Sequence, residues 1–116
     1  MELDAAVHTL SALAHASRLT VFRLLVQAGD SGLPAGEIAR LTEIVPSTLS
    51  THLAVLTQAG LISARRDGRL IIYTADYARM RELLGFLLED CCAGAPEVCA
   101  PLAQIAARAA CCEPAA

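Results

Sequence analysis

The 116-residue chain is poor in aromatic side chains, which make up only 3% of its residues although 55% are hydrophobic. The apolar content is mostly alanine, leucine, valine and isoleucine at helical spacing, which predicts a helix-rich protein and argues against a β-sandwich. A chain of this length has the size of one domain. It can bury only a modest fraction of its surface without a partner subunit.

Long apolar runs and an N-terminal targeting signal are also missing. Arg, His, Asp or Gln interrupts every apolar run well before the length needed to cross a bilayer. The first ten residues, MELDAAVHTL, lack the basic flank and apolar block of a signal peptide. We therefore expect the protein to be cytoplasmic.

Cysteine is absent from the first ninety residues, and all five cysteines lie in the last 26. Because cytoplasmic thiols stay mostly reduced, this clustering favours metal binding or redox sensing over a disulfide framework.

Lysine is absent, and acidic residues outnumber the nine arginines, so the formal net charge is -3. Such a balance is unusual for a protein that binds nucleic acid. However, Arg65, Arg66 and Arg69 fall within five positions. A local basic patch of this kind matters more for phosphate binding than the charge of the whole chain.

The N-terminal part of the chain has the spacing of two helices followed by a short third one. Ser17 is the expected N-cap of the second helix. The stretch AGDSGLPAGE is expected to form a turn, in which Pro34 suits the start of the third helix. The apolar positions that define the three helices are Leu3, Val7, Leu10 and Ala14, then Leu19, Phe22, Leu25 and Val26, then Ile38, Ala39 and Leu41.

The stretch TEIVPSTLSTHLAVLTQAGLI predicts a further helix, with Pro46 in its first turn and Gly60 at its end. A short helix, a tight turn and a second helix form a helix-turn-helix motif. The following LISARRDGRLIIYT has two strand-like runs joined by Asp67 and Gly68, which predicts a β-hairpin, or wing. The expected buried side of the second helix is Leu49, Leu53 and Leu56.

The opposite side of that helix is small and polar, and such side chains let a helix approach the major groove closely. The alternative is that these residues only cap and solubilise a surface helix, but the adjoining arginine-bearing hairpin favours DNA binding. His52 lies nearer the buried flank, where packing or a single phosphate contact is expected. The candidate DNA-binding residues are Ser47, Thr48, Ser50, Thr51, His52, Gln58, Arg65, Arg66 and Arg69.

A longer helix is expected from Asp76, and Gly94 and Pro96 end it. Pro101 then opens a last helix before the tail CCEPAA. We divide the chain into a winged helix-turn-helix and dimerisation domain, residues 1–90, and a cysteine-rich sensing segment with its tail, residues 91–116. The apolar stripe of the longer helix is Met80, Leu83, Leu84, Leu87, Leu88 and Cys91.

The segments RLTVFRLL, EIARLTEIVPSTLSTHLAVLTQAGLI and RRDGRLIIYT resemble the ArsR/SmtB family of metal-responsive bacterial repressors, over nearly the whole chain. The resemblance implies a mainly α, homodimeric winged helix-turn-helix protein with a small β-hairpin. It also implies that the dimer binds double-stranded operator DNA with an inverted repeat, and that metal binding weakens this complex. AHASR, residues 14–18, departs from the family pattern, because many members have an acidic residue and a proline there.

Many family members carry a cysteine cluster in the helix before the recognition helix, but TEIVPS has no thiol. Instead, LLEDCCAGAPEVC is similar to the C-terminal arsenite site of another subgroup, which places Cys91, Cys92 and Cys99 at the metal. The chemistry agrees, because trivalent arsenic binds three soft thiolates in a pyramid. The implied inducer is As(III), or also Sb(III) or methylated As(III), and no organic cofactor is expected.

Other readings of the thiols stay open. Cys91 could be a small core residue, because free cysteine is often buried. Zinc would normally recruit four ligands, often with histidine or carboxylate, but His8 and His15 are distant in sequence, and we expect both to be structural or solvent-facing. For Cys111 and Cys112 we expect an auxiliary or dispensable role.

Other functions also stay open. The runner-up is a repressor with a thiol redox switch, although Glu89 and Asp90 disfavour thiolate activation by local charge. A repressor of another soft metal ion and a metal-storage protein are further alternatives. An enzyme is not expected, because the chain has no nucleophile-base arrangement and no phosphate loop.

Overall fold

The computed structural model describes residues 1–88, and all five cysteines and the helix predicted from Pro101 lie outside the described residues. The described part is mainly helical, with one small antiparallel sheet in the strand order β1-β3-β2. In chain order the elements are α1 (Leu3–Leu13), α2 (Ala16–Ala28), the 3-10 turn η1 (Gly29–Ser31), β1 (Leu33–Pro34), α3 (Ala35–Thr42), α4 (Pro46–Gln58), β2 (Ile62–Asp67), β3 (Leu70–Ala75) and α5 (Tyr77–Leu88).

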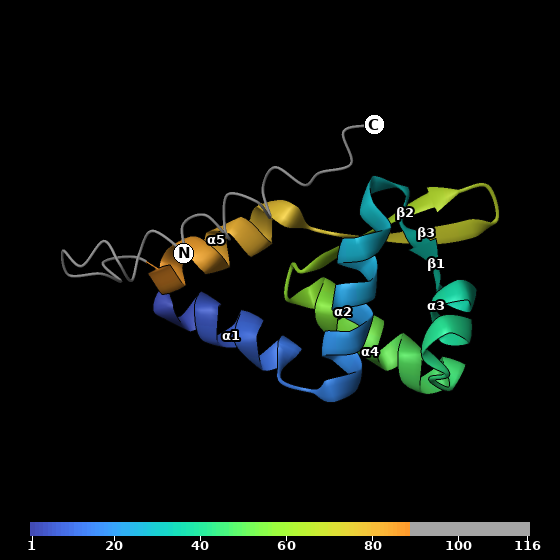
Figure 1. Ribbon diagram of the computed structural model, residues 1–116, viewed down its shortest axis with the longest axis horizontal. Coiled ribbons are helices and arrows are strands. Elements are labelled where there is room, and N and C mark those ends of the chain that lie inside the picture. Colours follow the sequence, from blue (N-terminus) through green and yellow to red (C-terminus); the bar gives the residue numbers. More distant parts are fainter. Residues whose placement is uncertain (89–116) are drawn as a thin grey trace.

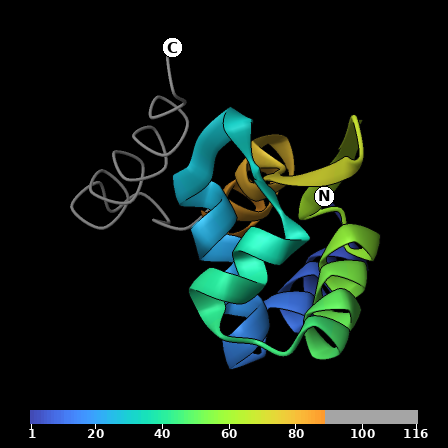
Figure 2. The ribbon, with the colours of Figure 1, turned by 90° about the vertical axis from the view of Figure 1, so that its right-hand side faces the viewer.

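The helix-turn-helix pair α3 and α4 packs against α2, and the β2-β3 hairpin follows α4 directly. Helices α1 and α5 lie side by side at one end of the molecule, and the hairpin projects from the other end (Figure 1). Figure 2 shows α3 in front of α2, with α4 beside them. The predicted winged helix-turn-helix architecture is confirmed in this element order.

Helix α4 begins and ends as its sequence predicts. Pro46 occupies its first turn, where a missing backbone N–H costs nothing. At the other end Gly60 has a φ of 78°, and the backbone N–H groups of Gly60 and Leu61 donate to the carbonyls of Thr57 and Leu56. This pair of bonds is a Schellman motif, which satisfies the last carbonyls of the helix.

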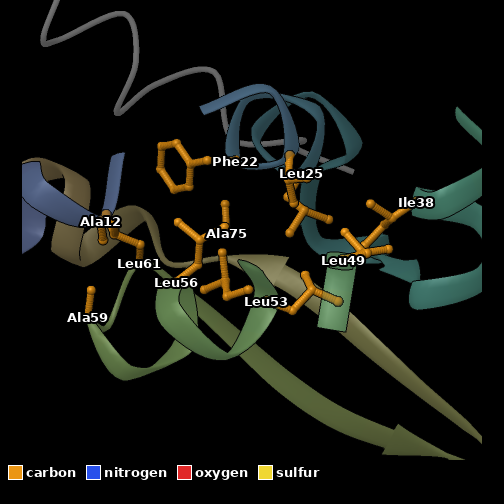
Figure 3. Close-up of a cluster of buried hydrophobic side chains, with 12 residues drawn as sticks. Ala12, Phe22, Leu25, Ile38, Leu49, Leu53, Leu56, Ala59, Leu61 and Ala75 are labelled. Atoms are coloured by element: carbon orange, nitrogen blue, oxygen red, sulfur yellow. The ribbon is translucent and has the colours of Figure 1, made fainter. Parts of the chain in front are cut away.

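The core lies between α2, α3, α4 and the sheet (Figure 3). The three leucines predicted to form the buried side of α4 are at most 3% exposed. Both neighbouring helices form where the apolar spacing predicts them, but Leu19 of α2 and Leu41 of α3 are each more than 40% exposed. Val21 fills the core in place of Leu19, so the buried face of α2 is rotated relative to the predicted stripe.

The region AGDSGLPAGE, which was expected to be a turn, contains η1 and the short strand β1. This strand makes the sheet three-stranded. Leu33 pairs with Tyr73 and Pro34 with Ile72, so β1 adds two residues to the free edge of β3. Gly32 has a φ of 64°, and a Cβ there would collide with the carbonyl oxygen of Tyr73. The close approach of this chain segment to β3 therefore depends on glycine.

The loop of the hairpin lies one residue later than predicted. Asp67 pairs with Leu70, so the two-residue loop is Gly68 and Arg69, not Asp67 and Gly68. Gly68 has a φ of 63°, as the first loop position of a type I′ or II′ turn requires. Because strand side chains alternate between faces, this register decides which arginines face the same side of the wing.

The bend between α1 and α2 also differs from expectation, since the N-cap of α2 is His15 rather than Ser17. The Nδ1 atom of His15 accepts a hydrogen bond from the backbone N–H of Ser17 at 3.1 Å. Arg18 closes the same corner by donating from Nε to the carbonyl of Ala12 at 2.6 Å. These contacts form the bend at AHASR, where the sequence departs from the family pattern.

Among residues 1–88, no helix has the length and apolar content needed to span a membrane.

Candidate nucleic-acid interface

Helix α4 exposes a continuous polar surface on the side opposite its leucines. Its members reach solvent because the helical period places them away from the three buried positions. Small hydroxyl and amide side chains on such a surface can bond both phosphates and base edges. The exposed polar side chains of α4 are Ser47, Thr48, Ser50, Thr51, Thr57 and Gln58.

An open groove of about 520 Å³ separates this surface from the sheet. Ser50 and Gln58 line it on the helix side, and Ala64 and Tyr73 line it on the sheet side. The helix and the wing therefore border one concave surface. Tyr73 was not predicted as a candidate, because its position in the groove depends on the hairpin register.

The three wing arginines do not share one environment. Arg66 belongs to the strand face that includes Ala64 and Tyr73, because side chains two residues apart share a face. It therefore extends the groove-side face of the wing toward the tip. Arg69 is exposed in the hairpin loop. These two guanidinium groups can meet a phosphate backbone that lies against α4.

Arg65 lies on the opposite face of the wing and is engaged within the protein. Its Nη1 donates to the carbonyl of Asp30 at 3.0 Å, and its Nη2 donates to the carbonyl of Ser31 at 3.1 Å. The guanidinium thus ties β2 to η1. Arg65 fits a role in holding the wing in place better than a role in contacting DNA.

His52 lies off the exposed surface of α4. Its side chain is only 7% exposed, and its ring centroid is 4.7 Å from that of His15. Burial, followed by the charges of His15 and Arg18, lowers the pKa of His52 below the ordinary value of 6.5. Of the two roles expected for His52, a largely buried ring that disfavours its charged form fits packing against the core better than contact with a phosphate.

The N-terminus of α4 holds a residue that polarity-based reasoning missed. Val45 is the N-cap, it makes no capping hydrogen bond through its side chain, and it is 61% exposed. In the sequence, Val45 is unusual only because it is apolar at the N-cap position, where Ser, Thr, Asp or Asn is preferred.

No metal centre is formed by the residues that the structure describes: in the range 1–88, no three His, Cys, Asp or Glu side chains are grouped to hold an ion. The predicted ligands Cys91, Cys92 and Cys99 lie outside that range. Their role stays a prediction.

Comparison with known proteins identifies the fold and the motif. A helix-turn-helix domain family matches residues 13–64. The HTH-type transcriptional regulator YgaV of Escherichia coli K12 is 32% identical over 89 residues, which cover 77% of this chain and 88% of that protein. A Halobacterium salinarum protein that carries the name "putative arsenical resistance operon repressor" is 40% identical over 67 residues, which cover 58% of this chain and 51% of that protein.

A solved structure agrees with this assignment. The homodimeric winged helix-turn-helix DNA-binding domain of Mb0332 from Mycobacterium bovis, described as a possible ArsR-family regulator, superimposes with a TM-score of 0.60 at 31% identity. The match covers 76% of this chain and 82% of that domain. These relatives are DNA-binding regulators and not enzymes. With its α3-α4 motif, its wing and these relatives, the chain belongs to the ArsR family of winged helix-turn-helix transcriptional regulators.

Proposed function

We propose that this regulator is an arsenite-responsive repressor. It binds an inverted-repeat operator as a homodimer and leaves the operator when Cys91, Cys92 and Cys99 capture trivalent arsenic. The observation that carries the proposal is the position of the thiols: all five cysteines lie in the 26 residues that begin three positions after Leu88, the last described residue of α5.

The dimer is supported by α1, which buries small side chains within the subunit and exposes large apolar ones. The helix buries the small residues Ala6, Thr9 and Ala12 within the subunit. It exposes the large apolar ones, with Leu3 at 65%, Val7 at 54% and Leu10 at 40%. Exposed apolar side chains in one stripe mark an interaction surface.

The adjacent helix α5 adds to this apolar surface, because Leu87 is 49% exposed. A second copy with two-fold symmetry would cover the α1-α5 surface and place two α4 helices on one side of the dimer. Two half-sites would then lie about 34 Å apart or a multiple of that, which corresponds to an inverted repeat. The solved relative that is homodimeric supports this arrangement.

The start of α5 is bonded to the segment that follows α4 and to α2, so a change in the position of α5 can act on the end of α4. The N–H of Asp76, just before α5, donates to the carbonyl of Leu61 at 2.8 Å, and the hydroxyl of Tyr77 donates to the carbonyl of Val26 at 2.9 Å. The guanidinium of Arg79 lies so close to Gly60 that a Cβ there would be 2.8 Å from Nη2. A movement of α5 would therefore act first on Gly60 and Leu61, whose backbone N–H groups close the C-terminal end of α4.

Arsenite is favoured as the inducer by the number and type of the thiols. Three soft thiolates satisfy the pyramidal coordination of trivalent arsenic without histidine or carboxylate. The relative from Halobacterium salinarum, whose name refers to arsenical resistance, supports the same assignment.

Arsenite titration of the complex with labelled operator, with fluorescence anisotropy as readout, tests the sensor. Cys91→Ser and Cys92→Ser should keep operator affinity and lose release, and Cys99→Ser should raise the arsenite needed. Methylarsenite, which binds two thiolates, should be affected least by Cys99→Ser. As the matched control, Cys111→Ser combined with Cys112→Ser should respond like the wild type.

Two outcomes would point elsewhere. If the tail pair is essential while Cys91 and Cys92 are dispensable, the sensor is wrongly placed although the repressor assignment survives. If peroxide releases the operator, a phosphine restores binding and arsenite has no effect, the protein is a redox switch and not an arsenite sensor.

A further inference from the structure

Val45 is a large apolar side chain held in solvent at the start of the recognition helix. It is the N-cap of α4, with φ and ψ of -57° and 133°, and 61% of it is exposed. Its neighbour Ile44 packs against the core, so the turn between α3 and α4 sends one apolar side chain inward and the next outward.

The fold does not account for valine at this position. An N-cap is favoured when its side-chain oxygen accepts a hydrogen bond from a first-turn N–H group, and valine has no such oxygen. Val45 accordingly makes no side-chain capping bond, and it is not part of the hydrophobic core. A residue that weakens its own helix without a packing gain is expected mainly at functional sites.

The position of Val45 points to DNA bases. The first residues of a recognition helix contact base edges in the major groove, and Val45 directly precedes Pro46 and Ser47 on the exposed N-terminal end of α4. Thymine is the base that presents a methyl group in that groove, and apolar side chains recognise it by contact.

We propose that Val45 is a specificity-determining residue that packs against the C5-methyl group of a thymine in each operator half-site. The inference rests on the proposed operator binding and is independent of arsenite. A rival explanation is that Val45 joins Leu41, which is 47% exposed on α3, in an apolar patch for another protein.

Deoxyuridine separates the two explanations, because it differs from thymidine only by the missing methyl group. The wild-type protein first selects its preferred duplex from a random library, and each thymine of that duplex is then replaced in turn. At one thymine per half-site, wild-type affinity should fall about fourfold, which corresponds to exposing one buried methyl group. Val45→Ala, whose single methyl group reaches less far, should show a smaller difference between the thymine and uracil duplexes at that position.

Two further variants distinguish recognition from folding and from a general apolar patch. Val45→Ser should unfold at the same or a higher temperature, because serine is a better N-cap, and it should also lose the thymine preference. Leu41→Ala should keep the full wild-type response to uracil.

The inference is overturned if the wild type tolerates uracil at every position, or if Val45→Ala retains the same loss. Failure to select any duplex would instead overturn the proposed operator binding and this inference together.

Discussion

His52 faces the interior at the junction of α4 with the α1-α2 corner, so its titration affects stability. Its pKa is lowered by burial and by the nearby charges of His15 and Arg18. Between the folded-state pKa and the ordinary value of 6.5, the unfolded chain binds more protons than the folded one. The contribution of neutral His52 to the free energy of unfolding is therefore complete above pH 6.5. It is lost as the pH falls from 6.5 through the lower pKa of the folded state.

We therefore expect the midpoint of urea unfolding to be lower at pH 5.5 than at pH 7.5. His52→Gln keeps a polar side chain of similar size that does not titrate, and it should show a smaller difference between the two pH values. An equal acid effect in both proteins would mean that other groups cause it.

The arginines of the wing should differ in how they act on DNA. If Arg66 and Arg69 contact phosphates as proposed, Arg66→Ala and Arg69→Ala should each weaken binding to operator and random duplex alike. Each should also reduce the slope of log affinity against log salt concentration by about one. Arg65→Ala removes the hydrogen bonds to Asp30 and Ser31 and should weaken binding with little change in slope. Affinities measured at four salt concentrations separate these outcomes. A reduction of the slope by about one in Arg65→Ala, with no change in Arg66→Ala or Arg69→Ala, would reverse our assignment.

At the scale of the elements, the junction between η1 and β1 depends on Gly32. A Cβ there would be 2.7 Å from Ile72 Cγ2 and would press on the carbonyl of Tyr73, and the positive φ adds about 1 to 2 kcal/mol of strain. Gly32→Ala should therefore lower the free energy of unfolding by more than that strain alone.

Gly36 in α3 provides the matched control, because a Cβ at this position meets nothing within 4 Å. Gly36→Ala should leave stability unchanged or raise it by about 0.5 kcal/mol, since alanine favours helix. Denaturant unfolding of both variants measures the contrast. Equal stabilities would show that β1 does not require the close approach of Gly32 to β3.

The sequence predicted an element correctly where its apolar spacing and its start and stop residues indicated the same helix or strand. Helix α4 has three leucines on one side, a proline at its start and a glycine after its end, and all three signals were correct. Strand β1 could not be predicted, because two residues have no period and Gly32 and Pro34 resemble a turn. The His15 cap was missed because its contacts are formed in the folded corner.

The register of the wing shows a second limit of sequence reasoning. Asp67 and Gly68 correctly indicated a hairpin, but a shift of the loop by one residue exchanges the faces of the arginines. As a result, the exposed polar side of α4 was predictable from periodicity, whereas the engagement of Arg65 with η1 was not.

At the scale of the whole molecule, the apolar α1-α5 surface is expected to hold the dimer together. Val7→Glu places a charge in the centre of this surface and should give monomers at micromolar concentration with much weaker operator binding. Leu19→Glu is the control, because Leu19 is also exposed but belongs to α2 and should leave the dimer intact. Sedimentation velocity distinguishes the two. A dimeric Val7→Glu protein would place the interface elsewhere.

Coupling between the thiols and the operator is the central claim, and the reciprocity of binding tests it most directly. Arsenite is titrated calorimetrically into the free dimer and into the operator complex, with a phosphine as the reductant so that no added thiol competes. Linkage requires operator to weaken arsenite binding by the same factor by which arsenite weakens operator binding, about 5-fold to 150-fold for typical couplings. We predict equal factors within that range. Identical arsenite affinity with and without operator would contradict the proposed repressor mechanism.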